Sequence, residues 1–220
     1  MEFESRHQCL IYEGAPSEIL RTLAFVLKRK LDEGYRCLYL NSVPMVAGMR
    51  STLAAIGIDV AYEIARASLI LSSDTVAPGR DFNCHEMLAK LEDSLDQALT
   101  DGYKGLWATG DMSWEFGHKK DFSKLLEYEL GLEKIFQKRK EFCGICQYHK
   151  DILPKEAMRQ SLKSHSSFFL NETLTRLNPH YLGSAGNTEI NSSNDELDAM
   201  IEIICKEQLD IAKINAMDRR

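Results

Sequence analysis

The side chains best suited to binding a ligand stand directly after the short apolar runs of this 220-residue sequence. Tyr12 and Glu13 follow the first run, residues 109–115 follow the fourth, and residues 148–150 follow the fifth. These segments supply aromatic, acidic and imidazole groups, which can wall a small-molecule pocket and anchor its occupant. If the runs are parallel strands, their carboxyl ends meet at one edge of a sheet, and we expect the site there.

The segment GLWATGDMSW at residues 105–114 is the least ordinary in the chain. Asp111 either holds a metal ion or accepts backbone N–H bonds within its own loop. Trp114 lies in the loop, where a large aromatic ring can wall a pocket. Asp111 and Glu115 are a weak candidate for an acid–base pair, because only a loop separates them.

The turn after the first apolar run lacks the features of a phosphate loop. Such a loop reads G-x-x-x-x-G-K-[ST], whereas residues 13–20 read EGAPSEIL. Pro16 has no backbone N–H to offer a phosphate, and the carboxylates of Glu13 and Glu18 would repel one. We therefore expect no nucleotide hydrolysis and no cofactor. A nucleotide-binding protein or ATPase with a non-standard loop stays as an alternative.

Cys143 and Cys146 form a CxxC motif with His149 three residues later, a spacing that raises metal binding or thiol redox chemistry. On a strand, however, positions i and i+3 point to opposite faces, so the two sulfurs cannot share one ion. We interpret both cysteines as buried thiols. His7 and His165 are interpreted as structural histidines, with a ligand role as the alternative.

The elements that must position these residues alternate along the chain. Strands are expected at residues 8–12, 36–40, 67–71, 105–109, 142–148 and 167–170. Helices are expected after a cap at Ser17, at 45–56 and 87–99, after a cap at Asp121, and after Pro154. The alternation and the apolar strands predict a three-layer α/β/α fold with a mostly parallel sheet, RecA-like (P-loop NTPase-like) but without a functional phosphate loop.

The C-terminal part of the chain differs in composition from the rest of the sequence. Residues 1–183 form the predicted domain, 184–194 a flexible Gly/Ser/Asn linker, and 195–220 an amphipathic helix capped by Asn194 or Asp195. Its apolar stripe comprises Leu197, Met200, Ile201, Ile204, Ile211 and Ile214. The helix either packs back on the domain or forms a homodimer or output contact, in which case the chain is a scaffold or interaction protein.

Charge and composition exclude several classes of partner. The formal charge is −6, and residues 189–220 carry eight acidic against four basic side chains, so we expect no direct nucleic-acid binding. No apolar run approaches the length of a membrane span or follows a basic leader, so we expect neither a membrane segment nor a signal peptide. Six cysteines without such a leader favour a cytoplasmic, reducing location.

The order and spacing of short motifs over residues 7–170 resemble those of the MEDS sensory domain, described in methanogen and methylotroph regulators. These motifs are His7-x-Cys9-x-x-Tyr12, GYRCLYL at 34–40, GIDV at 57–60, GYKGLWATGDMSW at 102–114, Leu126-x-Tyr128-Glu129, Cys146-Gln-Tyr-His149 and His165. The resemblance implies a RecA-like domain without nucleotide motifs. It also implies that the domain senses small organic compounds and signals to a histidine kinase or a transcriptional regulator.

The resemblance also extends the predicted site beyond the residues that follow the strands. It makes Tyr128 and Glu129, which sit on a helix, members of a shared pocket. The full predicted ligand-binding set is Tyr12, Glu13, Asp111, Trp114, Glu115, Tyr128, Glu129, Cys146, Tyr148, His149 and His165. The expected function is a non-catalytic sensory domain that binds a small organic ligand.

Overall fold

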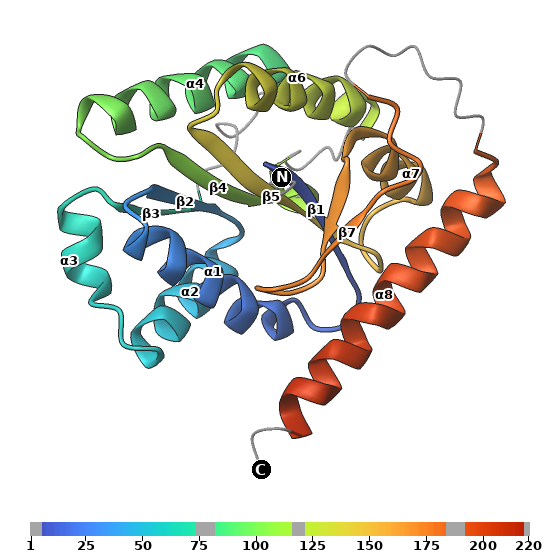
Figure 1. The fold of residues 1–220 in the computed structure, drawn as a ribbon, viewed down its shortest axis with the longest axis horizontal. Helices are drawn as coiled ribbons and strands as arrows, with labels where there is room; N and C mark the ends of the chain where they lie inside the picture. The colour runs from blue at the N-terminus through green and yellow to red at the C-terminus, as the bar shows by residue number, and fades with distance from the viewer. Residues whose placement is uncertain (1–5, 74–81, 116–121, 184–191, 218–220) are drawn as a thin grey trace.

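The computed structural model describes residues 6–73, 82–115, 122–183 and 192–217, which form helical layers on both faces of one sheet (Figure 1). The strands are β1 (His7–Tyr12), β2 (Arg36–Leu40), β3 (Leu69–Ser72), β4 (Leu106–Asp111), β5 (Phe142–His149), β6 (Ser167–Phe169) and β7 (Thr175–Leu177). They form a 7-stranded sheet in the order β3-β2-β4-β5-β1-β6-β7. Only the β6–β7 pair is antiparallel, which confirms the predicted fold class.

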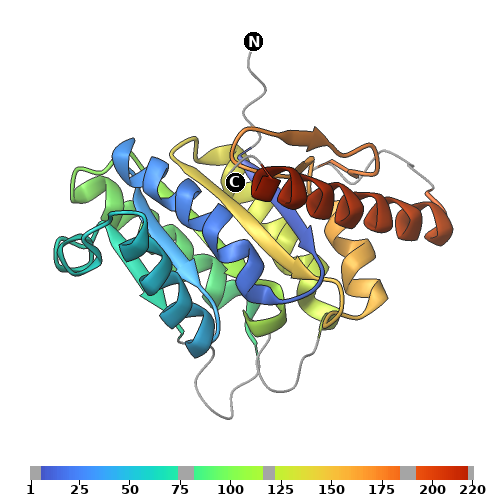
Figure 2. The ribbon, with the colours of Figure 1, turned by 90° about the horizontal axis from the view of Figure 1, so that it is seen from below.

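Helices cover the sheet in two layers (Figures 1 and 2). They are α1 (Leu20–Asp32), α2 (Val43–Ala55), α3 (Val60–Ala65), α4 (Cys84–Thr100), α5 (Met112–Glu115), α6 (Leu125–Lys138), α7 (Lys155–Ser164) and α8 (Asn194–Met217). Helices α1, α2 and α3 lie on one face, and α4, α6 and α7 lie on the other. Each layer has its own core, because alternate strand residues point to opposite faces: Leu10 packs on the α1 side, and Cys9 on the other.

The connections place a topological switch between β1 and β5. These neighbouring strands are followed by helices on opposite faces, α1 after β1 and α7 after β5. Such a switch opens a crevice at the carboxyl ends of the strands, where open α/β sheets bind their ligands. The two turns meet there, since the N–H of Lys150 donates to the carbonyl of Tyr12 at 2.9 Å.

Helix α8 packs beside α7 and against β1 (Figure 2). Its Leu197, Ile201 and Ile204 are buried in the same core as α6 and α7, so this stripe packs back on the domain. The helix is capped by Ser193, whose N–H donates to Glu196 at 2.7 Å while the Glu196 N–H donates to Ser193 Oγ at 3.3 Å. The expected cap at Asn194 or Asp195 was therefore wrong, because this reciprocal capping box begins one residue earlier.

Other boundaries also differ from the sequence predictions. Ser17 does not cap α1: a 3₁₀ turn, Pro16–Ile19, precedes the helix, and proline with its fixed φ suits the first position of such a turn. The short elements α3 and β7 were not predicted. The expected cap Asp121 and most of the predicted linker lie outside the described residues.

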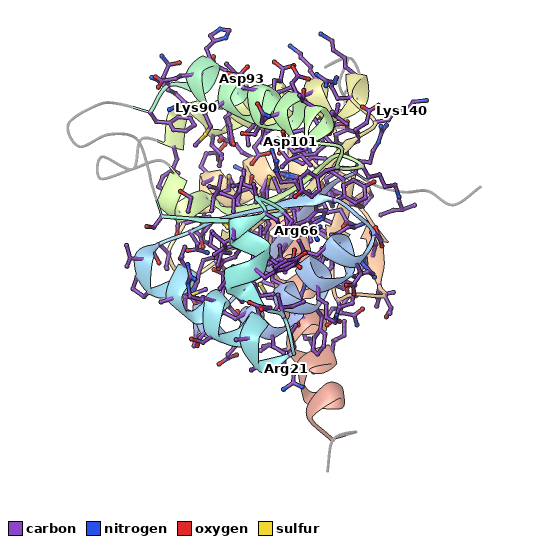
Figure 3. All side chains as sticks on the ribbon, turned by 90° about the vertical axis from the view of Figure 1, so that its left-hand side faces the viewer. Arg21, Arg66, Lys90, Asp93, Asp101 and Lys140 are labelled. Carbon is purple, nitrogen blue, oxygen red and sulfur yellow. The ribbon has the colours of Figure 1, made fainter. Side chains whose placement is uncertain are left out.

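Charged side chains lie on the outer faces of the helical layers, as Lys90 and Asp93 do on α4 (Figure 3). Within the described ranges, no helix combines the length and apolarity needed to span a bilayer.

Candidate functional site

The turn after β1, here called the first corner (residues 13–18), is closed by its own hydrogen bonds. The N–H of Gly14 donates to Asp151 Oδ2 at 2.9 Å. A carboxylate therefore already accepts the hydrogen bond that this N–H would otherwise donate to a phosphate. Lys150 Nζ lies 2.9 Å from Glu13 Oε2 and 2.6 Å from Glu202 Oε2. Burial alone would lower the pKa of Lys150, but these two carboxylates raise it. The lysine at this corner is therefore a neutralised cation and not a phosphate ligand.

His149 is held at the first corner by two backbone groups. Its Nε2 lies 2.9 Å from the carbonyl oxygen of Gly14, and the N–H of Asp151 donates to its Nδ1 at 3.2 Å. Together these bonds assign the proton of a neutral ring to Nε2. The ring has both nitrogens in use, so it serves to join the β1 and β5 turns.

Asp111 ends β4 and is buried beside the first corner. Tyr12 donates its hydroxyl to Asp111 Oδ2 at 3.1 Å, and the N–H of Ser113 donates to Oδ1 at 2.8 Å. The carboxylate thus accepts a backbone N–H bond from the segment that follows it, one of its two sequence-based interpretations, although that segment is the short helix α5 and not the expected loop. Among the residues described, Asp111 joins no group of three or more possible metal ligands. Trp114 and Glu115 lie on α5, and their side chains are outside the described part of the chain.

A second group of side chains lies between the sheet and the α6–α7 layer, and we call it the buried centre: His7, Glu129, Cys146 and His165. His7 comes from β1, Cys146 from β5, Glu129 from α6, and His165 directly follows α7. The β1–β5 register pairs Cys9 with Cys146, and so brings His7 next to Cys146 on one face. One nitrogen, oxygen or sulfur atom from each of the four lies within 4.8 Å of the other three.

The contacts inside the buried centre are short and converge on one carboxylate oxygen. Glu129 Oε2 is 3.2 Å from His7 Nε2, 3.4 Å from His165 Nε2 and 3.6 Å from Cys146 Sγ. His7 Nε2 is 3.4 Å from Cys146 Sγ. Tyr148 donates its hydroxyl to the other oxygen, Oε1. All these residues are at most 6% exposed, so the centre is sealed from solvent.

Outer partners fix the orientation of both imidazoles. His7 Nδ1 lies 2.9 Å from Glu133 Oε2, and Tyr181 donates its hydroxyl to Glu133 Oε1 at 2.6 Å. His165 Nδ1 lies 2.9 Å from the carbonyl oxygen of Ser161. Because a carbonyl only accepts, Nδ1 of His165 carries the proton, and Nε2 turns a lone pair toward Glu129. This buried Nε2 has no hydrogen bond.

The charges of the buried centre follow from these contacts. Burial would lower the pKa of His7, but hydrogen bonds to Glu129 and Glu133, with their charges, raise it above its ordinary value. Burial lowers the pKa of His165 to about 4, and the charge of His7 adds to this effect. Burial would raise the pKa values of Glu129 and Glu133, but His165, His7 and Tyr148 lower that of Glu129, and His7, Tyr181 and Gln137 lower that of Glu133. The two carboxylates and His7 therefore favour the charged forms of one another.

An apolar cavity adjoins the buried centre. It has a volume of about 30 Å³ and lies between β4, β5, α4 and α6. Ala108, Met112, Tyr128 and Leu132 line it, and Cys146 is part of its wall. A wider groove of about 210 Å³, lined by basic residues that include Arg6 and Lys140, lies at the opposite edge of the sheet, by the amino ends of β1 and β5.

The structure divides the predicted ligand-binding set between these regions. The first corner contains or contacts Tyr12, Glu13, Asp111 and His149. The buried centre contains or contacts Glu129, Cys146, Tyr148 and His165. The apolar cavity is lined by Tyr128. The separation of the CxxC cysteines is confirmed, since Cys143 packs on the α1 side and Cys146 on the α6 side. The predicted ligand-binding set did not include His7 or Glu133. His7 could have been found from the sequence, because it belongs to the motif His7-x-Cys9 that the family resemblance uses.

Comparison with known protein families gives one match. Residues 6–166 match the family described as MEthanogen/methylotroph, DcmR Sensory domain (MEDS). No curated protein matches the chain. The family match covers more than half of the chain and contains every residue of the buried centre. The chain therefore belongs to the MEDS family of sensory domains.

Proposed function

We propose that this chain is a non-catalytic sensory domain that binds a small organic ligand and signals to a histidine kinase or a transcriptional regulator. Membership of a sensory-domain family supports the sensory role. The apolar cavity beneath β4 and β5 is the observation that carries the choice of ligand. Its lining is almost entirely hydrocarbon, and a dry apolar cavity binds small apolar molecules.

The size of the cavity limits the ligand. A cavity needs about 10–15 Å³ in the same measure to hold one water molecule, so the 30 Å³ observed accommodate roughly two groups of that size. Tyr128 contributes the one large polar side chain to the wall, and Cys146 contributes a thiol. These features favour a compound of one to about three heavy atoms with an apolar body.

The first corner argues against a nucleotide as the ligand. Three carboxylates, from Glu13, Glu18 and Asp151, belong to the corner or contact it, and its Lys150 is already paired. Unit charges of like sign repel by about 1 kcal/mol or more at a few ångströms near a protein surface. A triphosphate at this corner would have to break the Gly14–Asp151 and Lys150–Glu13 contacts before it formed its own.

The contact between the first corner and α8 offers a path for the signal. Lys150 bridges Glu13 of the corner and Glu202 of α8. A ligand that moved β4 or β5 would shift the turns at the carboxyl edge, and this bridge would transmit the shift to α8. The outward face of α8, which includes the 44% exposed Ile203, is then the surface that a partner or a second copy would contact.

A thermal-unfolding screen of the full chain tests this function. The probes are xenon, alcohols, amines and haloalkanes of up to about three heavy atoms, and Mg-ATP, because a ligand that binds only the folded state raises the Tm. The variant Ala108→Val adds two methyl groups inside the cavity, and Ala89→Val adds the same groups on the exposed side of α4.

We expect a small organic probe to raise the Tm of the wild type and of Ala89→Val, and to have less effect on Ala108→Val. Mg-ATP should have no effect on any of them. Stabilisation by Mg-ATP alone, or an equal response of both variants to every organic probe, would contradict the proposal.

A further inference from the structure

The buried centre offers the donor set of a transition-metal site. It combines two imidazole nitrogens, a thiol sulfur and a carboxylate oxygen, from His7, His165, Cys146 and Glu129. Nitrogen and sulfur donors of this kind select zinc and similar first-row metals over magnesium or calcium, which prefer oxygen alone.

Four of the six distances between the donor atoms are close to the edges of a tetrahedral zinc site. Zinc binds sulfur at about 2.3 Å and nitrogen or oxygen at about 2.0–2.1 Å, so donor atoms in a tetrahedral site stand about 3.4–3.6 Å apart. The four distances among Glu129 Oε2, His7 Nε2, Cys146 Sγ and His165 Nε2 given above lie between 3.2 and 3.6 Å. The two remaining distances, from His165 Nε2 to His7 Nε2 and to Cys146 Sγ, are at most 4.8 Å, so side-chain adjustments would bring all four donors to bonding distance of one ion.

The outer partners are those that metal-binding histidines require. A metal-bound imidazole commonly donates its other N–H to a carboxylate or a backbone carbonyl, which fixes the tautomer and aims the free nitrogen at the ion. His7 Nδ1 meets the carboxylate of Glu133, and His165 Nδ1 meets the carbonyl of Ser161. Both Nε2 atoms consequently point into the same space.

The second nitrogen of His165 is the observation that a purely structural network leaves unexplained. It is 0% exposed, forms no hydrogen bond, and lies 3.4 Å from a carboxylate oxygen that is also an acceptor. A buried acceptor without a donor is destabilising, because it loses its hydrogen bonds to water and gains none in return. A cation bound by this nitrogen would satisfy it, and the carboxylate oxygen could bind the same ion.

We propose that the buried centre binds one divalent transition-metal ion, best matched by Zn²⁺, through His7 Nε2, His165 Nε2, Cys146 Sγ and Glu129 Oε2. Four protein donors fill a tetrahedral shell, so the ion has no open position and its role is structural. It joins β1, β5, α6 and the end of α7 around the topological switch. Binding of the ion would displace any protons that its imidazole and thiol donors carry.

The metal site can be tested with the metal alone, although it shares Cys146 with the wall of the apolar cavity. The full chain is freed of metal with a chelator and titrated with Co²⁺, which reports tetrahedral geometry by intense visible bands and thiolate coordination by a near-ultraviolet charge-transfer band. Zn²⁺ is then added to displace it. We expect one equivalent of Co²⁺, both signals, and their loss on addition of one equivalent of Zn²⁺.

The CxxC motif supplies a matched pair of variants. Cys146→Ser should lose the charge-transfer band, whereas Cys143→Ser, on the opposite face of β5, should keep it. Glu133→Gln keeps all four donors and should weaken Zn²⁺ binding by about 10–100-fold, as expected for an outer partner. If Cys146→Ser does not fold, the wild-type spectrum and Glu133→Gln decide the question. No charge-transfer band in the wild type, or a band lost in Cys143→Ser but kept in Cys146→Ser, would overturn the proposal.

Discussion

Replacement of Ile204 by alanine tests whether α8 is part of the folded domain. Ile204 is 0% exposed and belongs to the core that contains Cys9, Leu162 and Phe168. Truncation of a fully buried isoleucine to alanine costs about 2–5 kcal/mol, because both hydrocarbon burial and packing are lost. A loss of about 3 kcal/mol corresponds to a fall of about 6–12 °C in the Tm of a domain of this size.

The neighbouring residue provides the control. Ile203 is 44% exposed on the same helix, so Ile203→Ala has the same effect on helix propensity with a much smaller loss of burial. Calorimetry of the two variants should show a large fall in Tm for Ile204→Ala and a fall of about 2 °C or less for Ile203→Ala. Equal Tm values would show that α8 does not pack on the domain in solution, and would refute the reasoning from burial.

Two further predictions concern the first corner and the thiol of α8. Tyr12→Phe removes the hydroxyl that donates to the buried Asp111, and should lower the free energy of unfolding by about 1.5–3 kcal/mol in urea titrations. Tyr62→Phe removes an exposed hydroxyl and should leave the free energy of unfolding almost unchanged. Equal losses in the two variants would contradict a stabilising hydrogen bond between Tyr12 and Asp111. Burial raises the pKa of Cys205 to about 12, so native alkylation at pH 8 should be orders of magnitude slower than in urea, whereas equal rates would show that the thiol is accessible.

The architecture was predictable because its signals are local. Each of the strands β1 to β6 is a short apolar run, and the breaks at Gly34, Gly57 and Gly102 separate them from amphipathic helices. The alternation of strand faces also predicted that Cys143 and Cys146 would diverge. The six-residue α3 and the three-residue β7 carry too few residues to show a period, and their positions depend on the elements around them.

The candidate site was predicted only in part, because its residues are distant in sequence. His7 lies 126 residues from Glu133 and 139 from Cys146, and no local pattern brings them together. Strand positions alone placed the ligand-binding residues at the carboxyl edge of the sheet, and only the family resemblance added residues such as Glu129 and His165. Glu129 and His165 lie instead in the layer beneath the sheet, since their positions are fixed by the packing of α6 and α7 against β1 and β5.

We infer that the chemistry of this domain lies in the buried layer beneath β1 and β5 and not at the first corner. A crystal structure of the full chain grown with Zn²⁺ and a non-hydrolysable ATP analogue, with anomalous data at the zinc edge, tests this most directly. We predict one strong anomalous peak bonded to His7, Glu129, Cys146 and His165, and the Gly14 N–H still bound to Asp151. Phosphate density on the Gly14 N–H, with no peak in the buried centre, would contradict the account.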